Sequence, residues 1–586
     1  MAYRTVLAFA LCALTSAACG SSGSADGIGG SAGSADPRAG GAAGSGRGGN
    51  STGGGNSTGG GNGAGTGGAA GDSSGGRGGT NTGGASGTDG SSAMAGASVG
   101  GHGGRGGSGG TAGSGGSLGV ISSVDTSLNG SQRYVLRVDG KPYFLTEIQV
   151  RLDKQRYRLK WNATGWNAIL AQMASDGFNT VSIPLMWYDI EPTKDKFDWT
   201  LLDQYLELCK SNHLKMELLW FSQNSGGTVQ WLGDPSNPVH LRTPDYVLYS
   251  PSPSSNATTS EFKKTGAYTL DLKDTTLRAR EVYVVTQLMA HIAAWDAANG
   301  SPHTVIGMQL GNEVNSFSEA TMQDYYSAIG AAVKASSYSV WTRMNVINTT
   351  LLDGMVKANE AARSKGGTGV DFVGADLYDG SVAPNPVQMT RTNSGKNFRM
   401  IVEIAAEVPN ISQLSLAALS GDTAFAYYEA CGSDGHGIYV GNGANAFKPK
   451  GSNIGAIRTT NHMLLSDVYD LALLKPQSTG NSGFFVHNWA GTSSSATTGV
   501  RGVGFTPSSS DSQGISIARS STEIVLMNTL GGTFSYPASL QVGAATRGSF
   551  DANNTWVAEG DVNFSSSSIT PPAGSTVRIT IGRTSP

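Results

Sequence analysis

The fold is decided by residues 176–221, which read DGFNTVSIPLMWYDIEPTKDKFDWTLLDQYLELCKSNHLKMELLWF. Two apolar runs, Phe178–Leu185 and Leu214–Phe221, enclose a stretch of helical period at Leu202–Asn212. Short and nearly continuous apolar runs are typical of strands that are buried on both faces of a sheet. The segment therefore predicts a strand, a helix and a second strand that is parallel to the first.

Six further apolar runs continue this alternation, and segments of helical period follow most of them. The eight predicted strands are Tyr143–Val150, Phe178–Leu185, Leu214–Phe221, Thr304–Leu310, Val340–Val346, Asp371–Tyr378, Phe398–Ile404 and Ala424–Ala430. Eight parallel strands covered by helices form a closed barrel. We therefore expect a (β/α)8 TIM barrel within residues 119–476, with residues 119–142 as a leader hairpin on its underside.

From residue 477 onwards the helical period gives way to alternating strands. We expect residues 477–586 to form a C-terminal antiparallel β-sandwich domain. The strand-like runs are GFFVHNWA, GISIARS, EIVLMNT, FSYPASLQVG, NTWVAEGDV and STVRITIG. Binding of carbohydrate and support of the barrel are both open as roles for this domain.

The N-terminal part of the chain has a different composition. Residues 20–118 hold 43 of the 85 glycines and no Phe, Trp or Tyr. Such a stretch lacks the apolar surface that would offset the entropy lost on ordering. We therefore expect a disordered Gly/Ser-rich linker ahead of the folded part.

Residues 1–19 resemble an export signal. Arg4 precedes the apolar run VLAFALCAL, which is too short to span a bilayer. The ending SAAC at Cys19 is similar to a bacterial lipoprotein signal, in which the cysteine is lipid-modified. Lipidation at Cys19 and plain secretion remain alternatives, and both predict an exported protein, extracellular or on the outer surface. We expect no membrane contact other than such a lipid.

Charge and residue spacing exclude several classes of function. The net charge is −3 and no Lys/Arg cluster is present, so we expect no nucleic-acid partner. No CxxC pair or HExxH motif occurs and the eight histidines lack metal-ligand spacing, so we expect no metal or other cofactor. Cys209 and Cys431 are either a disulfide or two buried thiols. The sequence does not indicate the oligomeric state.

The active site of such a barrel lies at the C-terminal ends of its strands. Five carboxylates end a predicted strand or lie inside one: Glu147, Glu217, Glu313, Asp376 and Glu403. Glu313 closes the fourth strand and Glu403 ends the seventh, in runs where an ionisable group is costly unless it is paired or used. These two strands face each other across the mouth. Two carboxylates about 5–5.5 Å apart hydrolyse a glycosidic bond with retention, and the charge of Glu403 would raise the pKa of Glu313 so that it acts as the acid.

Residues 143–476 resemble the barrel of the clan A retaining glycoside hydrolases, and within that clan the β-galactosidase-like families 35 and 42. The resemblance rests on DGKPYFLTEIQ, on the segment quoted first, on VIGMQLGNEV and on MIVEIA. It implies that Glu313 is the acid/base, that Glu403 is the nucleophile and that Asn312 binds the sugar 2-hydroxyl. The implied partner is a carbohydrate substrate with β-glycosidic bonds, in an oligo- or polysaccharide.

Other residues are candidates for sugar contacts or for structural roles. Aromatic rings near strand ends can stack on a sugar or pack in the core, and these are Trp187, Trp220, Trp231, Tyr378 and Trp489. Gln149 and Arg151 follow the first strand as candidate polar contacts, and an ion pair between Arg151 and Asp153 is the alternative. We expect Glu191 to anchor a loop and Glu217 to pair with a cation, with Glu407 and Glu429 as rival nucleophiles.

Two alternative functions remain open. A non-catalytic carbohydrate-binding barrel would keep the aromatic residues while its two glutamates stayed apart. An endo-acting clan A glycanase, such as a mannanase or glucanase, would have an open groove. The insertion Ser222–Asp274 is expected to cover the mouth and leave a pocket, which favours exo action on β-linked galactose or a related hexose.

Overall fold

The structure is a computed structural model that describes residues 119–127, 133–223, 227–234, 237–248, 261–266, 268–314, 322–347, 349–367, 369–377, 396–408, 411–432, 436–441, 447–451, 453–489 and 498–582. The predicted signal and linker, residues 1–118, lie outside the described residues. Within the described ranges, no helix combines the length and the apolar character needed to cross a bilayer.

Eight parallel strands close into a barrel, which confirms the predicted TIM barrel. They are β4 (Glu147–Gln149), β5 (Thr180–Met186), β6 (Lys215–Phe221), β11 (Val305–Val314), β12 (Trp341–Val346), β13 (Phe372–Asp376), β14 (Met400–Ala405) and β15 (Ala424–Tyr428). They are neighbours in this order, and β15 pairs with β4 to close the barrel. Each predicted barrel strand overlaps one of the eight.

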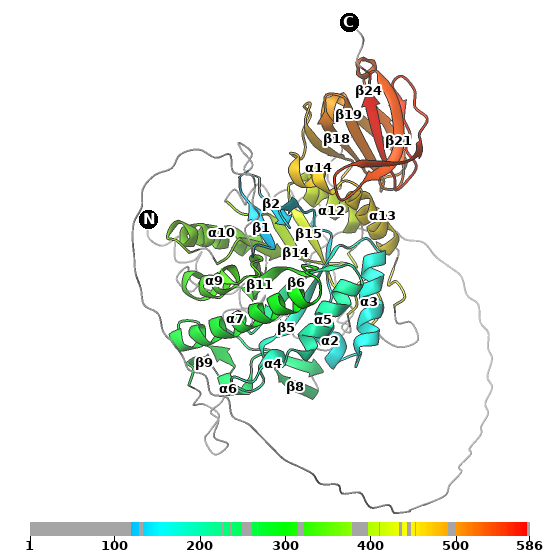
Figure 1. The fold of residues 1–586 in the computed structure, drawn as a ribbon. Coiled ribbons are helices and arrows are strands. Elements are labelled where there is room, and N and C mark those ends of the chain that lie inside the picture. Colours follow the sequence, from blue (N-terminus) through cyan, green and yellow to red (C-terminus); the bar gives the residue numbers. More distant parts are fainter. Residues whose placement is uncertain are drawn as a thin grey trace, which may run out of the picture. The chain divides into compact units, whose positions relative to one another are not determined.

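Helices cover the barrel because each buries one apolar face against it. In α5 (Thr200–Ser211) the buried residues are Leu202, Tyr205, Leu206 and Cys209, a spacing that places them on one side of a helix. Figure 1 shows α7, α9 and α10 along the outside of the barrel. The helices of this layer are α2 (Leu152–Tyr157), α3 (Ala163–Ser175), α4 (Trp187–Ile190), α5, α7 (Thr275–Ala298), α9 (Ser327–Ala335, preceded by a π-helical turn at Met322–Tyr326), α10 (Thr349–Ser364), α12 (Ile411–Ser420) and α13 (Asn453–Leu465).

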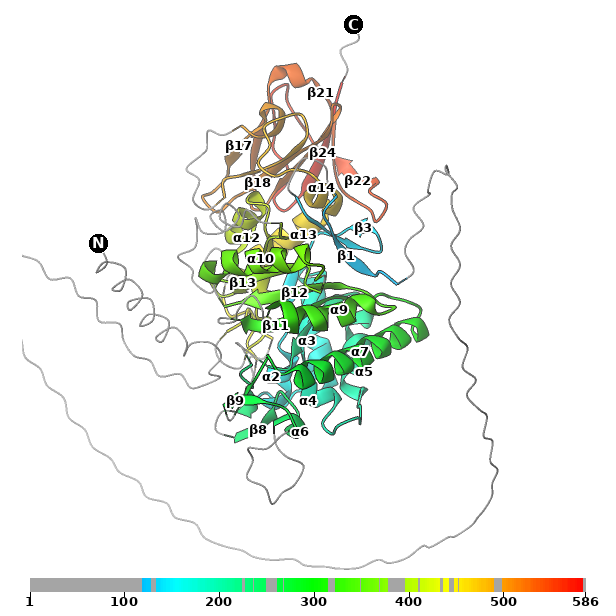
Figure 2. The same ribbon diagram turned by 90° about the vertical axis from the view of Figure 1, so that its left-hand side faces the viewer.

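The leader and the insertion lie at opposite ends of the barrel, as Figures 1 and 2 show through β1 at one end and β8, β9 and α6 at the other. The leader strands are β1 (Ser122–Asp125), β2 (Val135–Val138) and β3 (Lys141–Pro142), and the insertion holds β7 (Trp231–Asp234), β8 (Asn237–Leu241), α6 (Asp245–Leu248), β9 (Lys264–Gly266) and β10 (Thr269–Leu270). The Ile121 N–H donates to the Ser339 carbonyl at 2.8 Å, just ahead of β12. The leader therefore underlies the N-terminal ends of the strands, as predicted.

The C-terminal part is antiparallel, as predicted, and begins after the short helix α14 (Val468–Leu473). Its strands are β16 (Gly483–His487), β17 (Gly504–Pro507), β18 (Gly514–Ser520), β19 (Glu523–Asn528), β20 (Gly532–Ser535), β21 (Val542–Phe550), β22 (Trp556–Asp561), β23 (Ser568–Ile569) and β24 (Thr576–Ile581). They form a six-stranded and a three-stranded sheet that share one apolar core.

One strand boundary differs from the prediction. FSYPASLQVG is interrupted by a 3-10 turn at Ala538–Leu540, and Gln541 follows with φ 45°. Pro537 has no N–H to donate to a ladder, so β20 ends before it.

Of the two alternatives for the cysteines, the structure shows buried thiols and not a disulfide, since Cys209 and Cys431 are both free and buried.

Candidate active site

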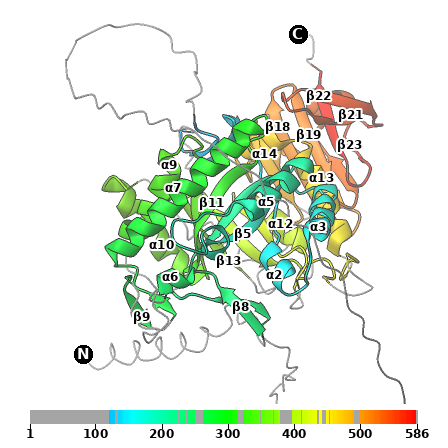
Figure 3. The same ribbon diagram turned by 60° about the horizontal axis from the view of Figure 1, so that its bottom comes forward.

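The two glutamates predicted to act together lie at the ends of β11 and β14. Figure 3 shows the barrel with one end brought forward, where β5, β11 and β13 are seen among the surrounding helices. Glu313 is 6% exposed and Glu403 is 5% exposed, so both are held inside the barrel mouth. A carboxylate so far from water needs either polar partners or a chemical use.

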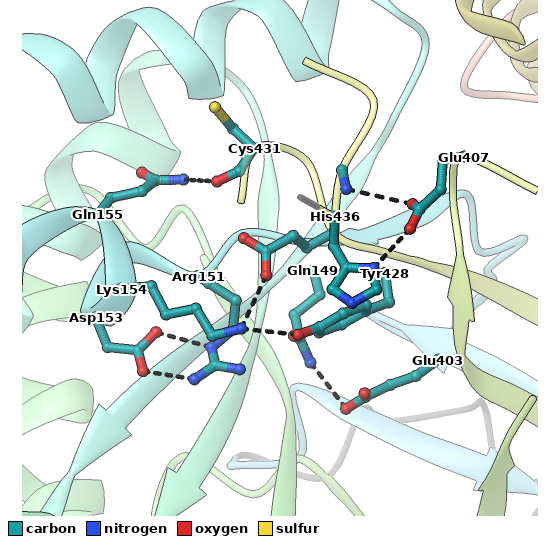
Figure 4. A network of polar contacts seen from close by, with 12 residues as sticks. Gln149, Arg151, Asp153, Lys154, Gln155, Glu403, Glu407, Tyr428, Cys431 and His436 are labelled. Atoms are coloured by element: carbon teal, nitrogen blue, oxygen red, sulfur yellow. Dashed lines mark hydrogen bonds and ion pairs between the residues drawn. The ribbon is translucent and has the colours of Figure 1, made fainter. Parts of the chain in front are cut away.

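Glu403 is held by two side-chain amides from neighbouring strands. Gln149 Nε2 donates to Glu403 Oε1 at 3.0 Å, and Asn345 Nδ2 donates to the same oxygen at 3.1 Å. Figure 4 shows Gln149 pointing toward Glu403. Hydrogen bonds to a charged acceptor are stronger than neutral ones, so this pair of amides fixes where the carboxylate lies. Gln149, predicted as a polar sugar contact, thus lies against Glu403, and its contact with a sugar stays a prediction.

Glu313 lies on an irregular strand end. The register between β11 and β12 shifts between Gly311 and Val314, and Glu313 has φ 44°. A left-handed backbone costs about 1–2 kcal/mol for a residue with a Cβ. Bulges of this kind re-aim a side chain, and strain of this kind gathers at functional sites. The preceding Asn312 accepts from Gln309 Nε2 at 3.0 Å, and its Nδ2 lies 3.5 Å from Glu313 Oε2.

Asp376 connects the two glutamates electrostatically. Burial raises the pKa of the Asp376 carboxyl well above its usual range, and the charges of Glu403 and Glu313 raise it further. Asp376 also pairs in register with Glu403 across β13 and β14. The charges of both glutamates therefore raise the pKa of one carboxyl group, at the same end of the barrel.

A chain of polar contacts runs from the barrel interior to Asn312. Arg343 Nε donates to Glu217 Oε2 at 2.7 Å, which confirms the expected cation partner of Glu217. Arg343 Nη1 also donates to Gln309, whose amide holds Asn312. All of these side chains are buried, so hydrogen bonds from the barrel interior fix the orientation of Asn312.

The interior carboxyl of Glu147 gives a prediction about stability. Burial and then the charge of Glu217 raise the pKa of Glu147 to about 8, so the folded protein keeps a proton that the unfolded chain releases above its usual pKa of 4.5. Rising pH between 5 and 8 therefore favours unfolding, by at most about 1.4 kcal/mol per pH unit. Glu147→Gln should flatten this slope in urea unfolding measured across that range, whereas Glu207→Gln, at an exposed position of α5, should not. An unchanged slope in Glu147→Gln would contradict the prediction.

Two of the aromatic residues that were predicted to stack on a sugar lie in the core instead. Trp187 and Trp220 are fully buried, and their ring centroids are 6.4 Å apart. Trp187 Nε1 donates to Glu191 at 2.9 Å and Trp220 Nε1 donates to Glu281 at 2.8 Å. Their faces are covered by protein, so neither ring offers a surface to a sugar. Glu191 also accepts from the Asp195 N–H at 2.7 Å, which is its expected anchoring role.

The remaining predicted contacts have mixed outcomes. Arg151 binds both oxygens of Asp153, at 2.8 and 2.7 Å, so the ion-pair alternative holds in this structure. Trp489 packs against an apolar cluster built from α12, α13, α14 and the C-terminal sheet, and this cluster contains no strand end of the barrel. Tyr378 lies outside the described residues, and so does the side chain of Trp231.

The rival nucleophiles have partners of their own. Lys154 Nζ donates to Glu429 Oε2 at 3.3 Å and to the Tyr428 hydroxyl at 2.9 Å, deep in the network of Figure 4. Glu407 pairs with His436 Nδ1 at 2.6 Å on a more exposed part of the chain. Neither has the two amide donors that hold Glu403.

The sequence reasoning missed Arg343 and Asn345. Both lie in β12, whose run WTRMNV is fully buried. Two polar residues with the spacing i, i+2 in a buried strand point to the same face, here the barrel interior. That spacing is the signal that could have found them.

A cavity of about 80 Å³ lies away from the strand ends that carry the glutamates. Its walls are mostly apolar and come from the leader, from the N-terminal ends of β14 and β15 and from α12–α14, and they include Leu136, Leu145, Phe425, Leu464 and Leu471. Because it holds none of the predicted site residues, it has no part in the candidate active site.

Comparison with known proteins gives one sequence match. Residues 157–235 match the model of glycoside hydrolase family 42, described as beta-galactosidase. No curated protein matches the chain.

Three similar solved structures are an exo-β-1,4-mannosidase, Op5Man5, from Opitutaceae bacterium strain TAV5, a family 30 subfamily 8 xylanase, Xyn30A, from Clostridium acetobutylicum, and a cold-adapted β-galactosidase from Rahnella sp. R3. Their identities to this chain are 14%, 11% and 12%, with TM-scores of 0.35, 0.40 and 0.39. The alignments cover 49%, 75% and 58% of this chain and 52%, 96% and 58% of those chains, so this chain spans about half of the mannosidase.

The family match contains β5, α5 and β6, the unit from which the fold was inferred. The chain thus combines a closed eight-stranded parallel barrel with a local similarity to this glycoside hydrolase family over residues 157–235.

Proposed function

We propose that the chain is an exported, β-galactosidase-like retaining hydrolase that cleaves β-glycosidic bonds of oligo- or polysaccharides with Glu313 and Glu403. The observation that carries this proposal is that Glu313 on β11 and Glu403 on β14 are both buried and both lie near enough to Asp376 for their charges to raise the pKa of its carboxyl. The match to a beta-galactosidase family supports galactose as the sugar.

The proposed reaction has two displacements. In the first, a Glu403 oxygen attacks the anomeric carbon while Glu313 gives its proton to the departing glycosidic oxygen, so that one C–O bond forms and another breaks. In the second, Glu313 takes a proton from water, whose oxygen attacks the same carbon and releases the Glu403 carboxylate. Asn312 would bind the sugar 2-hydroxyl, and its hydrogen bond from Gln309 and its contact with Glu313 support this role.

The stereochemistry of the first product tests this mechanism. Two inversions at one carbon give net retention, so hydrolysis of nitrophenyl β-galactoside should first release β-galactose. Proton NMR follows the anomer before mutarotation, and a panel of nitrophenyl β-glycosides shows which sugar is preferred. First release of the α anomer would indicate an inverting enzyme and would remove the covalent step.

Export is proposed from residues 1–19 alone. If Cys19 carries a lipid, cells fed labelled palmitate will label the wild-type chain and will not label Cys19→Ser. A chain that is exported without label in both cases would be secreted by the plain route, and a chain retained in the cytoplasm would contradict export.

A further inference from the structure

The barrel mouth contains a buried arginine with unused hydrogen-bond donors. Arg242 is 2% exposed, and its Nε and Nη1 meet no acceptor among the described residues. Burying a guanidinium is costly when the hydrogen bonds that it made to water are not replaced by hydrogen bonds to the protein. Such a group is kept where it serves a ligand or a reaction.

The position of Arg242 is set by its backbone and by one aromatic ring. Its N–H donates to the Gln230 carbonyl at 3.0 Å, and its own carbonyl accepts from the Tyr188 N–H at 2.9 Å. Its Cζ lies 4.4 Å from the ring centroid of Phe221, the last residue of β6. The insertion therefore delivers this side chain to the C-terminal ends of the strands.

The charges around Arg242 leave room for an anion. Burial and, after it, the positive charge of Arg151 lower the pKa of Arg242 to about 10, while Asp153 and Glu313 oppose this shift. Arg151 lies 5.5 Å from the same Phe221 ring. Asp153 is already occupied by two hydrogen bonds from Arg151. Two guanidinium groups thus flank one ring, and the described carboxylates do not satisfy the donors of the second.

We propose that Arg242 binds an acidic group on the substrate sugar, a uronate carboxylate or a sulfate ester. This inference rests on the proposed function and names its substrate class. An anion would supply the missing acceptors and would offset the repulsion between Arg242 and Arg151.

The test compares acidic and neutral substrates. The wild type should have a higher kcat/KM for nitrophenyl β-galacturonide or for the 6-sulfated β-galactoside than for plain β-galactoside, and the preferred acid identifies the source of the anion. Arg242→Gln should lower the ratio of acidic to neutral kcat/KM by about 30-fold or more. The matched control is Arg156→Gln, because Arg156 is bound to Asp189 at 3.0 Å, and it should keep the wild-type ratio. A ratio that is the same in Arg242→Gln and the wild type overturns the inference.

Binding separates this inference from the proposed function. In calorimetry, Glu403→Gln should bind galacturonate more tightly than galactose, and Glu403→Gln combined with Arg242→Gln should lose that difference. If no glycoside is hydrolysed but this difference is found, the hydrolase proposal fails and the anion site stands. If neutral galactosides are hydrolysed and neither galacturonate nor galactose 6-sulfate inhibits the wild type better than galactose, the anion site fails. This last comparison needs no variant, so it holds even if Arg242→Gln does not fold.

Discussion

Glu403→Ala will lower kcat/KM for nitrophenyl β-galactoside by about 10⁴-fold or more, because no oxygen remains to attack the anomeric carbon. The amides of Gln149 and Asn345, which now hold the carboxylate, will line the vacated space. Azide is small enough to enter that space and should restore part of the turnover by attacking the same face. Only one displacement then occurs, so the product is the α-glycosyl azide, which NMR identifies.

The control for this variant is Glu407→Ala. Glu407 was a rival from the sequence, it is more exposed than Glu403, and it pairs with His436 at 2.6 Å. Its loss should change kcat/KM by less than about threefold. If Glu407→Ala abolishes hydrolysis while Glu403→Ala retains it, the nucleophile has been placed on the wrong residue.

The barrel could be predicted because its strands are buried on both faces. All seven residues of β5 and all six of β14 are buried, so continuous apolar sequence marks them. β20 and β21 were harder, because their residues are partly exposed and a turn lies inside one apparent run. A strand boundary at a turn depends on local backbone geometry that hydrophobic pattern does not record.

The glutamates could be predicted for the same reason, since a charge at the end of an apolar run stands out. The direction of an aromatic ring could not. Trp220 lies near the end of a strand, where a ring could stack on a sugar. Its indole N–H instead donates to Glu281 on α7, so the ring is packed between the strand and that helix. Arg242 could not be predicted either, because its neighbours come from Phe221, Arg151 and Glu313, which only the closed barrel brings together.

The second large effect is expected from Glu313→Ala, and its size will depend on the leaving group. An acid is needed when the departing oxygen is basic, so kcat/KM for phenyl β-galactoside should fall by about 10²–10⁴-fold. Dinitrophenolate leaves without a proton, so the first displacement on the dinitrophenyl glycoside should be much less affected. The measurement is kcat/KM across a series of aryl galactosides, where the variant should show a steeper dependence on leaving-group pKa than the wild type. An equal loss for all leaving groups would indicate a structural role for Glu313.

Azide rescue of Glu313→Ala and the stability of Glu313→Gly together separate the chemical role of the Glu313 carboxyl from the effect of its left-handed backbone. In Glu313→Ala, Glu403 still forms the covalent intermediate, and azide then attacks it in a second displacement, so the product is the β-glycosyl azide, opposite to that of Glu403→Ala. Glu313 also has φ 44°, a conformation that alanine shares at a cost and glycine adopts freely. Glu313→Gly should therefore be more stable than Glu313→Ala by about 1 kcal/mol in urea unfolding, yet no more active without azide. A glycine variant with restored hydrolysis would mean that the strained backbone, and not the carboxyl, is what the reaction requires.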